Sequence, residues 1–159
     1  MTGAEDTGEA GDSGDAVDRA VAGHREVVAA GDHLFGELSM RDVAAGDGYL
    51  TIEMPVGRRI SNSRGALQGG LLAALADVAA GRLAMDGVEA GHSTATSDIT
   101  VHFLAPIVEG PARAQARVLR RGSRAVVIHV DIHDVATDRL AAVSTVAFVV
   151  LGPRPKPVR

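Results

Sequence analysis

Segments in which apolar and polar residues alternate dominate the second half of the chain. A period of two is typical of β-strands that bury one face. Four such segments follow one another, at residues 93–106, 111–122, 123–134 and 139–151. The last three are linked by the polar stretches RRGSR and DVATD, which predict tight hairpins. The pattern therefore predicts four consecutive antiparallel strands.

The first half of the chain predicts two shorter strands and one long helix. Residues 33–56 form two strands joined by AAGDG, and in the second strand Leu50, Ile52 and Met54 alternate with polar residues. Residues 69–86 are rich in Ala and Leu and have two glycines at their start, which favours a helix. The predicted helix has apolar side chains on nearly all of its own faces, as expected for a helix enclosed by other structure. A further helix is expected at 16–30, where apolar residues recur with helical spacing.

The simplest packing of these elements wraps one antiparallel sheet around the buried helix, a two-layer α+β arrangement. The sheet face turned away from the helix must then be polar or covered. Because the strands alternate only imperfectly, we expect an oligomer that buries part of this outer face.

Composition limits the domain organisation to one domain with flanking segments. The hydrophobic content of 46% suits a single compact domain at 16–151, and the aromatic content of 3% leaves aliphatic residues to fill its core. Residues 1–15 carry five acidic and no basic residues and predict a disordered acidic leader. Residues 152–159 predict a Pro-rich basic tail. The chain has no cysteine, which excludes disulfides, thiolate metal sites and a cysteine nucleophile.

Charge and hydropathy exclude several classes of partner. The net charge of −4 comes from the leader, so the remainder carries about +1 and has no basic excess for nucleic acid. No apolar run approaches the roughly 20 residues needed to cross a bilayer. The first residues also lack the pattern of a secretory signal. We therefore expect a cytoplasmic protein without nucleic-acid or membrane partners.

One carboxylate, Asp77, interrupts the apolar part of the long helix. A lone charge in a dry interior is costly unless it is hydrogen-bonded, paired or used in chemistry. Arg82, the nearest cation on the helix, lies five residues on and outside the favourable spacing of three or four. The start of the same helix offers hydrogen-bond donors and a partial positive charge instead of a carboxylate. Its first N–H groups lack helical partners, and Gly69 and Gly70 would let a ligand approach them.

These residues resemble the motif of the hotdog-fold acyl-CoA thioesterases, specifically the phenylacetyl-CoA thioesterase-like group. That motif reads Asn-x-x-Gly-x-x-His-Gly-Gly followed by Leu-x-Asp on the next helix. The matching positions here are Asn62, Gly65, Gly69, Gly70, Leu75 and Asp77. Gln68 replaces the histidine of the family, and it cannot carry a proton at neutral pH. The resemblance covers residues 33–151 and implies a hotdog fold and hydrolysis of acyl-CoA, with CoA as part of the substrate and no other cofactor.

The resemblance also implies roles for the matching residues. The Gly69 N–H would polarise the thioester oxygen, Gln68 would shape the first turn or bind the acyl end, and Asp77 would act as base or nucleophile. Eight residues separate Gly69 from Asp77, which is about 12 Å along a helix. The resemblance therefore implies a homodimer, or a homotetramer made of two such dimers, in which two subunits complete one site. Asn62 would orient water or substrate, although a turn role in ISNSRG fits equally well.

Further candidates come from the strands. Thr96 matches a family position that hydrogen-bonds the catalytic carboxylate, although alternation would place it on an ordinary polar face with Asp98 and Thr100. The hairpin arginines Arg120, Arg121 and Arg124 lie where relatives meet CoA phosphates, and a solvated basic hairpin is the alternative.

Three other functions compete with hydrolysis. His129, Asp131 and His133 share one strand face and could ligate a metal, but polar residues are also what an outer strand face should show. We expect no metal. A module that binds acyl-CoA without hydrolysing it is favoured by Gln68. A hydratase on the same fold would need a His–Asp pair that QGG does not provide.

Overall fold

The computed structural model describes residues 34–153 of the 159-residue chain. The elements are α2 (Leu34–Glu37), β1 (Arg41–Gly46), β2 (Tyr49–Met54), η1 (Arg58–Ile60), α3 (Gly69–Met85), β3 (Ser93–Phe103), β4 (Ala112–Arg121), β5 (Ala125–Asp134) and β6 (Arg139–Leu151). The helix expected at 16–30, the leader and most of the tail lie outside the described residues and stay predictions.

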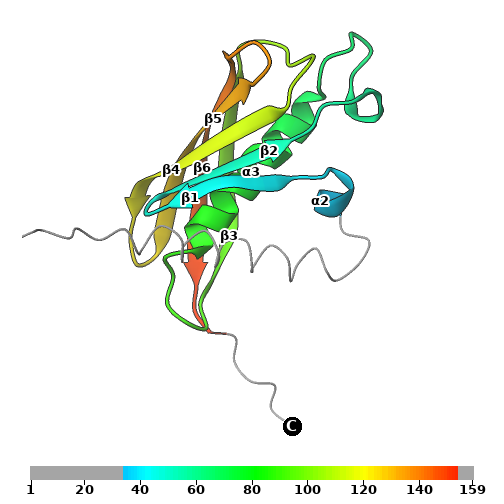
Figure 1. Ribbon diagram of the computed structural model, residues 1–159. Coiled ribbons are helices and arrows are strands. Elements are labelled where there is room, and N and C mark those ends of the chain that lie inside the picture. Colours follow the sequence, from blue (N-terminus) through cyan, green and yellow to red (C-terminus); the bar gives the residue numbers. More distant parts are fainter. Residues whose placement is uncertain (1–33, 154–159) are drawn as a thin grey trace, which may run out of the picture.

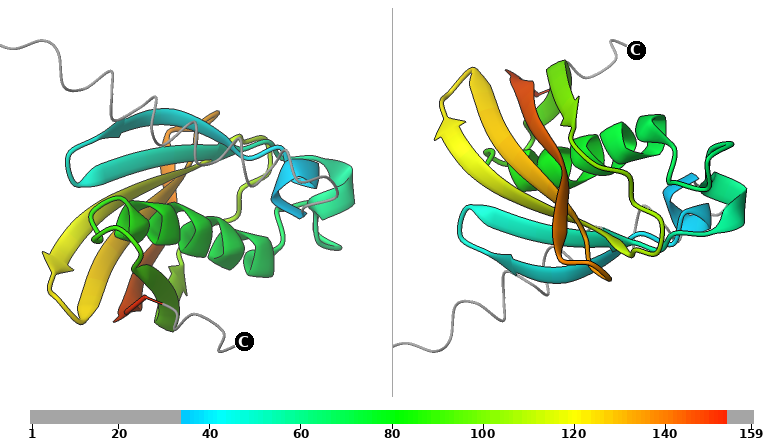
Figure 2. Two further views of the ribbon diagram at one scale, coloured as in Figure 1. Left: turned by 90° about the horizontal axis from the view of Figure 1, so that it is seen from below. Right: turned by 90° about the horizontal axis from the view of Figure 1, so that it is seen from above.

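The six strands form one antiparallel sheet in the order β1-β2-β4-β5-β6-β3. The α3 helix lies across one face, and the sheet curves around it (Figures 1 and 2). This is the hotdog architecture, so the predicted α+β fold class is confirmed. The predicted helix ends one residue later than α3 does, and all six predicted strands are present.

The first predicted strand pair differs in detail from the structure. Residues 34–37 form the short helix α2, and β1 begins only at Arg41. The connecting turn is also tighter than AAGDG, because β1 continues to Gly46 and pairs with Tyr49 across Asp47 and Gly48. Gly48 has a φ of +73°, a conformation that glycine adopts without strain.

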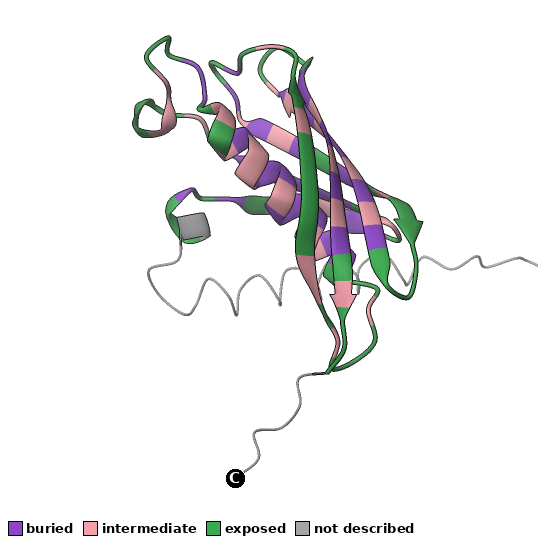
Figure 3. Cartoon of the chain, turned by 180° about the vertical axis from the view of Figure 1, so that it is seen from behind, coloured by how far each residue is buried: buried purple, intermediate pink, exposed green. Residues whose placement is uncertain are grey.

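The core is built largely from small side chains that hold α3 close to the sheet. On α3, Ala76, Ala79, Ala80 and Ala84 are fully buried. On β4, Ala112, Ala114 and Ala116 are buried and alternate with exposed or half-exposed residues. Larger residues fill the layer from β2 and β5, among them Ile52, Ile128 and Ile132, each with an exposed fraction of 0%. Figure 3 shows this buried layer between helix and sheet.

A β-bulge at Ser97 divides β3 into two parts of opposite parity. Thr96 pairs with Phe148 and Asp98 with Ala147, so Ser97 has no partner in the ladder. Neighbouring positions of β6 point to opposite faces, and Thr96 and Asp98 must therefore do so too. The expectation that Thr96 shares a face with Asp98 and Thr100 is wrong. Simple alternation fails because one extra residue shifts the register.

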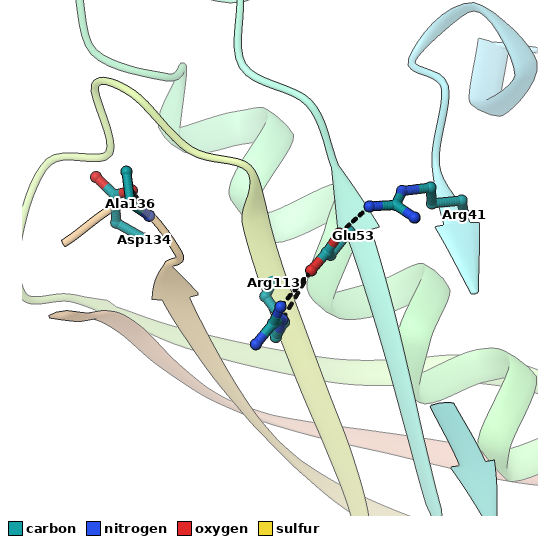
Figure 4. A network of polar contacts seen from close by, with 5 residues as sticks. All are labelled: Arg41, Glu53, Arg113, Asp134 and Ala136. Atoms are coloured by element: carbon teal, nitrogen blue, oxygen red, sulfur yellow. Dashed lines mark hydrogen bonds and ion pairs between the residues drawn. The ribbon is translucent and has the colours of Figure 1, made fainter. Parts of the chain in front are cut away.

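The outer sheet face carries an ion-pair network that joins three strands. Glu53 of β2 is 3% exposed, although it lies on the face without the helix. Its Oε2 lies 2.6 Å from an Arg41 nitrogen on β1, and its Oε1 lies 2.6 Å from an Arg113 nitrogen on β4 (Figure 4). Removing Glu53 from water is compensated by these two charge-assisted contacts.

Two further carboxylates are buried and satisfied by specific partners. Asp42 of β1 forms a two-point ion pair with Arg82 of α3, which ties the edge hairpin to the helix. Arg82 is thus engaged across the core rather than along its own helix. Asp134 accepts hydrogen bonds from the N–H groups of Gly110 (3.1 Å) and Ala136 (3.2 Å), and it fixes two loops at one end of the sheet.

Candidate active site

The start of α3 presents two backbone N–H donors without partners. Gln68 is the N-cap, and its side chain makes no capping hydrogen bond. Within residues 34–153, the N–H groups of Gly69 and Gly70 have no hydrogen-bond acceptor, whereas those of Leu71 and Leu72 donate to the Gln68 carbonyl. Free N–H groups at the positive end of a helix dipole are suited to hold a developing negative charge.

The two glycines have no conformational reason to be glycine in this protomer. Neither has a positive φ, and a Cβ added at Gly70 would meet nothing within 4 Å. A Cβ at Gly69 would make ordinary contact with the Phe103 ring at 3.4 Å. Glycine in a helix costs roughly 0.5–1 kcal/mol relative to alanine. Close approach of another molecule to this backbone would account for that cost.

The loop before α3 is fixed by hydrogen bonds at its base. The Gln68 N–H donates to the Ile60 carbonyl at 3.0 Å, and the Leu67 N–H donates to the Ile107 carbonyl at 2.8 Å. The free donors of Gly69 and Gly70 therefore start from a rigid base.

Asn62 stabilises this loop from inside. Its Oδ1 accepts hydrogen bonds from the N–H groups of Arg64 (2.9 Å) and Ala66 (3.2 Å). The alternative turn role proposed for Asn62 is therefore present in the structure. The same bonds fix the orientation of the carboxamide, which leaves its Nδ2 as a donor with a defined direction.

Asp77 is half-buried on α3 and is held by Thr96. The Thr96 hydroxyl donates to Asp77 Oδ1 at 2.9 Å. The Ser97 bulge gives Thr96 this direction, because it places Thr96 on the face that carries buried Phe148 and turns Asp98 to the other face. The second oxygen, Oδ2, has no hydrogen-bond partner among the described residues.

One protomer does not bring the two groups together. Gly69 and Asp77 lie on one continuous helix, about 12 Å apart along its axis and about 80° apart around it. Asn62 lies with the glycine donors, and Thr96 lies with Asp77. The predicted site residues thus form two clusters at different positions along α3.

The three hairpin arginines differ in what they contact. Arg121 donates to the carbonyls of Leu83 (3.0 Å) and Ala84 (2.9 Å) in the last turn of α3. It stabilises the negative end of the helix dipole and is not a free phosphate ligand. Arg120 and Arg124 are exposed.

Two of the three strand residues weighed as metal ligands interact with each other. His129 Nε2 lies 2.8 Å from Asp131 Oδ1 on the outer face of β5. Within the described part of the chain, no three His, Asp or Glu side chains are grouped closely enough to hold a metal ion.

The fold and the arrangement of the α3 start, Asp77 and Thr96 define the class: this is a hotdog-fold protein with a thioesterase-type motif on its central helix. Residues 64–141, just under half of the chain, match the family model of the thioesterase superfamily. Its class of activity is thioester hydrolysis. The resemblance found in the motif is confirmed at this level.

Individual relatives share the fold over most of their length. The chain is 25% identical over 126 residues to SSO2140 of Saccharolobus solfataricus, a protein that bears the name of an esterase, and the match covers 79% of this chain and 89% of that one. The crystal structure of the thioesterase HI1161 from Haemophilus influenzae superposes with a TM-score of 0.78 at 22% identity, covering 87% of this chain and 94% of that chain.

A third similar protein is SAV0944 of Staphylococcus aureus, described as a thioesterase enzyme. It is 21% identical, with a TM-score of 0.72 over 75% of this chain and 98% of that chain. It was crystallised as two alanine variants, one replacing a glutamine and the other a glutamate fifteen positions further on.

No helix among residues 34–153 is long and apolar enough to span a membrane. Location in the cytoplasm stays a prediction. Sequence reasoning missed Phe103, whose ring lies beside Gly69. The resemblance includes FLAP, residues 103–106, but only the register of the bulged strand shows which way the ring points.

Proposed function

We propose that the protein hydrolyses acyl-CoA thioesters to the free acid and CoA. The observation that carries the proposal is the Asp77 carboxylate, which Thr96 holds by one oxygen on the same helix that begins with two free N–H donors. Asp77 is half-buried, and its Oδ2 accepts no hydrogen bond from the described residues. Here one oxygen is left for chemistry.

In this proposal the thioester carbonyl oxygen accepts a hydrogen bond from the Gly69 N–H. Attack on the carbonyl carbon moves negative charge onto that oxygen, where the helix start stabilises it. In one route Asp77 Oδ2 takes a proton from the attacking water, the C–S bond then breaks, and CoA leaves as a thiolate that receives this proton. In the other route Asp77 Oδ2 attacks the carbonyl carbon, the C–S bond breaks with release of CoA thiolate, and water then hydrolyses the resulting anhydride. Asn62 Nδ2 donates to the water or the substrate.

The proposal requires a homodimer, because the two clusters of one protomer are too far apart to act on one carbonyl. The β3 edge supports this assembly: within residues 34–153, β3 is paired only with β6, and most of its residues are exposed. An edge strand with free N–H and C=O groups is suited to pair with a second copy. Ile99 (39% exposed) adds apolar surface along it.

The similar protein SAV0944 was crystallised as two alanine variants at a matching spacing. The two substituted residues of SAV0944 are fifteen positions apart, which equals the separation between Asn62 and Asp77. Arg120 and Arg124 are the proposed contacts for CoA phosphates, since Arg121 is engaged with the helix end.

The test is release of free thiol from a panel of acyl-CoAs by wild type, Asp77→Asn and Asp77→Ala. Wild type should release thiol, and both variants should lose at least about a hundredfold in kcat, since general acid–base catalysis contributes 10²–10⁴-fold. Ser63→Ala, an exposed change in the preceding loop, is the control and should retain activity. Undiminished turnover in both Asp77 variants would remove Asp77 from the mechanism.

Gln68 favours a second candidate, a protein that binds acyl-CoA without hydrolysing it. The Gln68 side chain is exposed and makes no capping bond, and it cannot exchange a proton at neutral pH. Tight binding of acyl-CoA without thiol release would identify this function. Gain of hydrolysis in Gln68→His would then show that the missing histidine is the cause.

A further inference from the structure

Phe103 ends β3 beside the first turn of α3. Its pairing with Ala142 places it on the helix side of the sheet, together with Ile99 and Val101, because the Ser97 bulge has changed the parity of the strand. The three atoms nearest to a Cβ added at Gly69 all belong to the Phe103 ring, at 3.4, 3.5 and 3.9 Å. The ring therefore lies directly beside the residue with the free N–H.

The ring is not part of the hydrophobic core. Phe103 is 56% exposed, whereas Phe148 on the same side of the sheet is 2% exposed. The residues around it continue the apolar surface: Leu104 is 57% exposed and Val108 is 55% exposed. The segment that carries them is joined to the loop before α3, since the Leu67 N–H donates to the Ile107 carbonyl.

We propose that Phe103 is a specificity-determining residue that forms the apolar wall against the acyl carbons next to the thioester carbonyl. This inference rests on the proposed function, in which the carbonyl oxygen binds the Gly69 N–H. The acyl carbons must then leave the carbonyl within a few ångströms of this amide, where the ring lies on one side. A flat wall this close accepts an unbranched or planar acyl group and rejects a methyl branch on the α-carbon.

The experiment compares butyryl-CoA with isobutyryl-CoA, which have the same carbon number and differ in α-branching. Wild type should prefer butyryl-CoA. Phe103→Ala should lower kcat/KM for butyryl-CoA and leave or raise that for isobutyryl-CoA, so that the ratio falls at least about tenfold. One methyl group in a tight apolar pocket is worth roughly 10–200-fold.

Two controls separate specificity from structural damage. Leu119→Ala removes a similarly exposed apolar residue (49%) at the β4 bulge and should leave the ratio unchanged. Sedimentation should give the same oligomeric state for Phe103→Ala and wild type. A common loss of kcat/KM for both substrates, or loss of the wild-type assembly, would overturn the assignment.

Calorimetric titration of the same two acyl-CoAs keeps this inference separate from the proposed function. If wild type releases no thiol, hydrolysis is refuted. The ratio of the two dissociation constants still measures how strongly Phe103 discriminates against the α-branched acyl group. A ratio that Phe103→Ala does not change overturns the role of Phe103. If wild type binds neither compound, both proposals fail.

Discussion

The hydrogen bond from Thr96 to Asp77 gives the sharpest prediction. Replacing Thr96 by valine keeps the shape of the side chain but removes the hydroxyl that donates to Asp77 Oδ1 at 2.9 Å. If the orientation of Asp77 matters for catalysis, kcat should fall. Thr96 is exposed and Asp77 is half-buried, so the loss should not greatly affect folding.

The size of the effect follows from the kind of bond and its exposure. Hydrogen bonds to charged groups contribute about 1.5–3 kcal/mol, and solvent at Thr96 reduces this to about 1–2 kcal/mol. Since about 1.4 kcal/mol corresponds to tenfold, we expect kcat/KM to fall by roughly 5–30-fold. Because the same hydrogen bond is present in the folded protein without substrate, the free energy of unfolding should fall by no more than this amount, about 1–2 kcal/mol.

The assay is thiol release at saturating and limiting acyl-CoA, with two control variants. Thr96→Ser keeps the hydroxyl and should stay near wild type. Thr100→Val removes a hydroxyl from the same strand but from the opposite face, and it should have no effect. The reasoning is refuted if Thr96→Val keeps more than half of the wild-type kcat/KM, or if Thr100→Val loses as much.

The remaining predictions concern stability and substrate binding. Gly110 has a φ of +67°, and a Cβ there would lie 2.5 Å from Val56 Cγ2, so Gly110→Ala should lower the free energy of unfolding by at least about 1 kcal/mol in urea titrations. Gly57→Ala, with open space around the added carbon, is its control, and an equal loss in both would contradict the steric explanation. Asp134→Ala removes the acceptor for two backbone N–H groups and should cost about 1–3 kcal/mol, whereas Asp134→Asn keeps an acceptor oxygen and should cost less. Arg121→Ala should lower Tm because it removes the donors to the last carbonyls of α3. Arg120→Ala should raise KM for acyl-CoA at unchanged Tm. A raised KM for Arg121→Ala together with a lowered Tm for Arg120→Ala would contradict these roles.

The type and order of the secondary-structure elements were predictable from the sequence, because the pattern that indicates each element is strong and lies within that element. Period-two segments and one apolar helix gave α3 and the last five strands with boundaries within a few residues, whereas the first predicted strand began too early, because Leu34–Glu37 forms α2 and β1 begins at Arg41. The six motif positions from Asn62 to Asp77 gave the superfamily. These signals lie within single elements and do not depend on how the elements meet.

The contacts between elements were not predictable from the sequence. The Ser97 bulge has no sequence signal of its own, yet it decides that Thr96 reaches Asp77 and that Phe103 reaches Gly69. The partner of Arg82 is Asp42, forty residues earlier, and helix spacing rules cannot find it. Arg121 resembled a phosphate ligand because nothing in RRGSR shows that its side chain folds back onto a helix end.

The buried alanines of α3 and β4 set the distance between the helix and the sheet. Asp77 lies on α3 and Thr96 lies on β3, so the distance between helix and sheet also affects the hydrogen bond between them. Because α3 is one continuous helix, a larger side chain beneath it would shift the whole helix. The Asp77 carboxylate would then move away from the Thr96 hydroxyl before the protein unfolds. Substitutions at these buried alanines would consequently lower the rate of turnover before they lower the thermal stability.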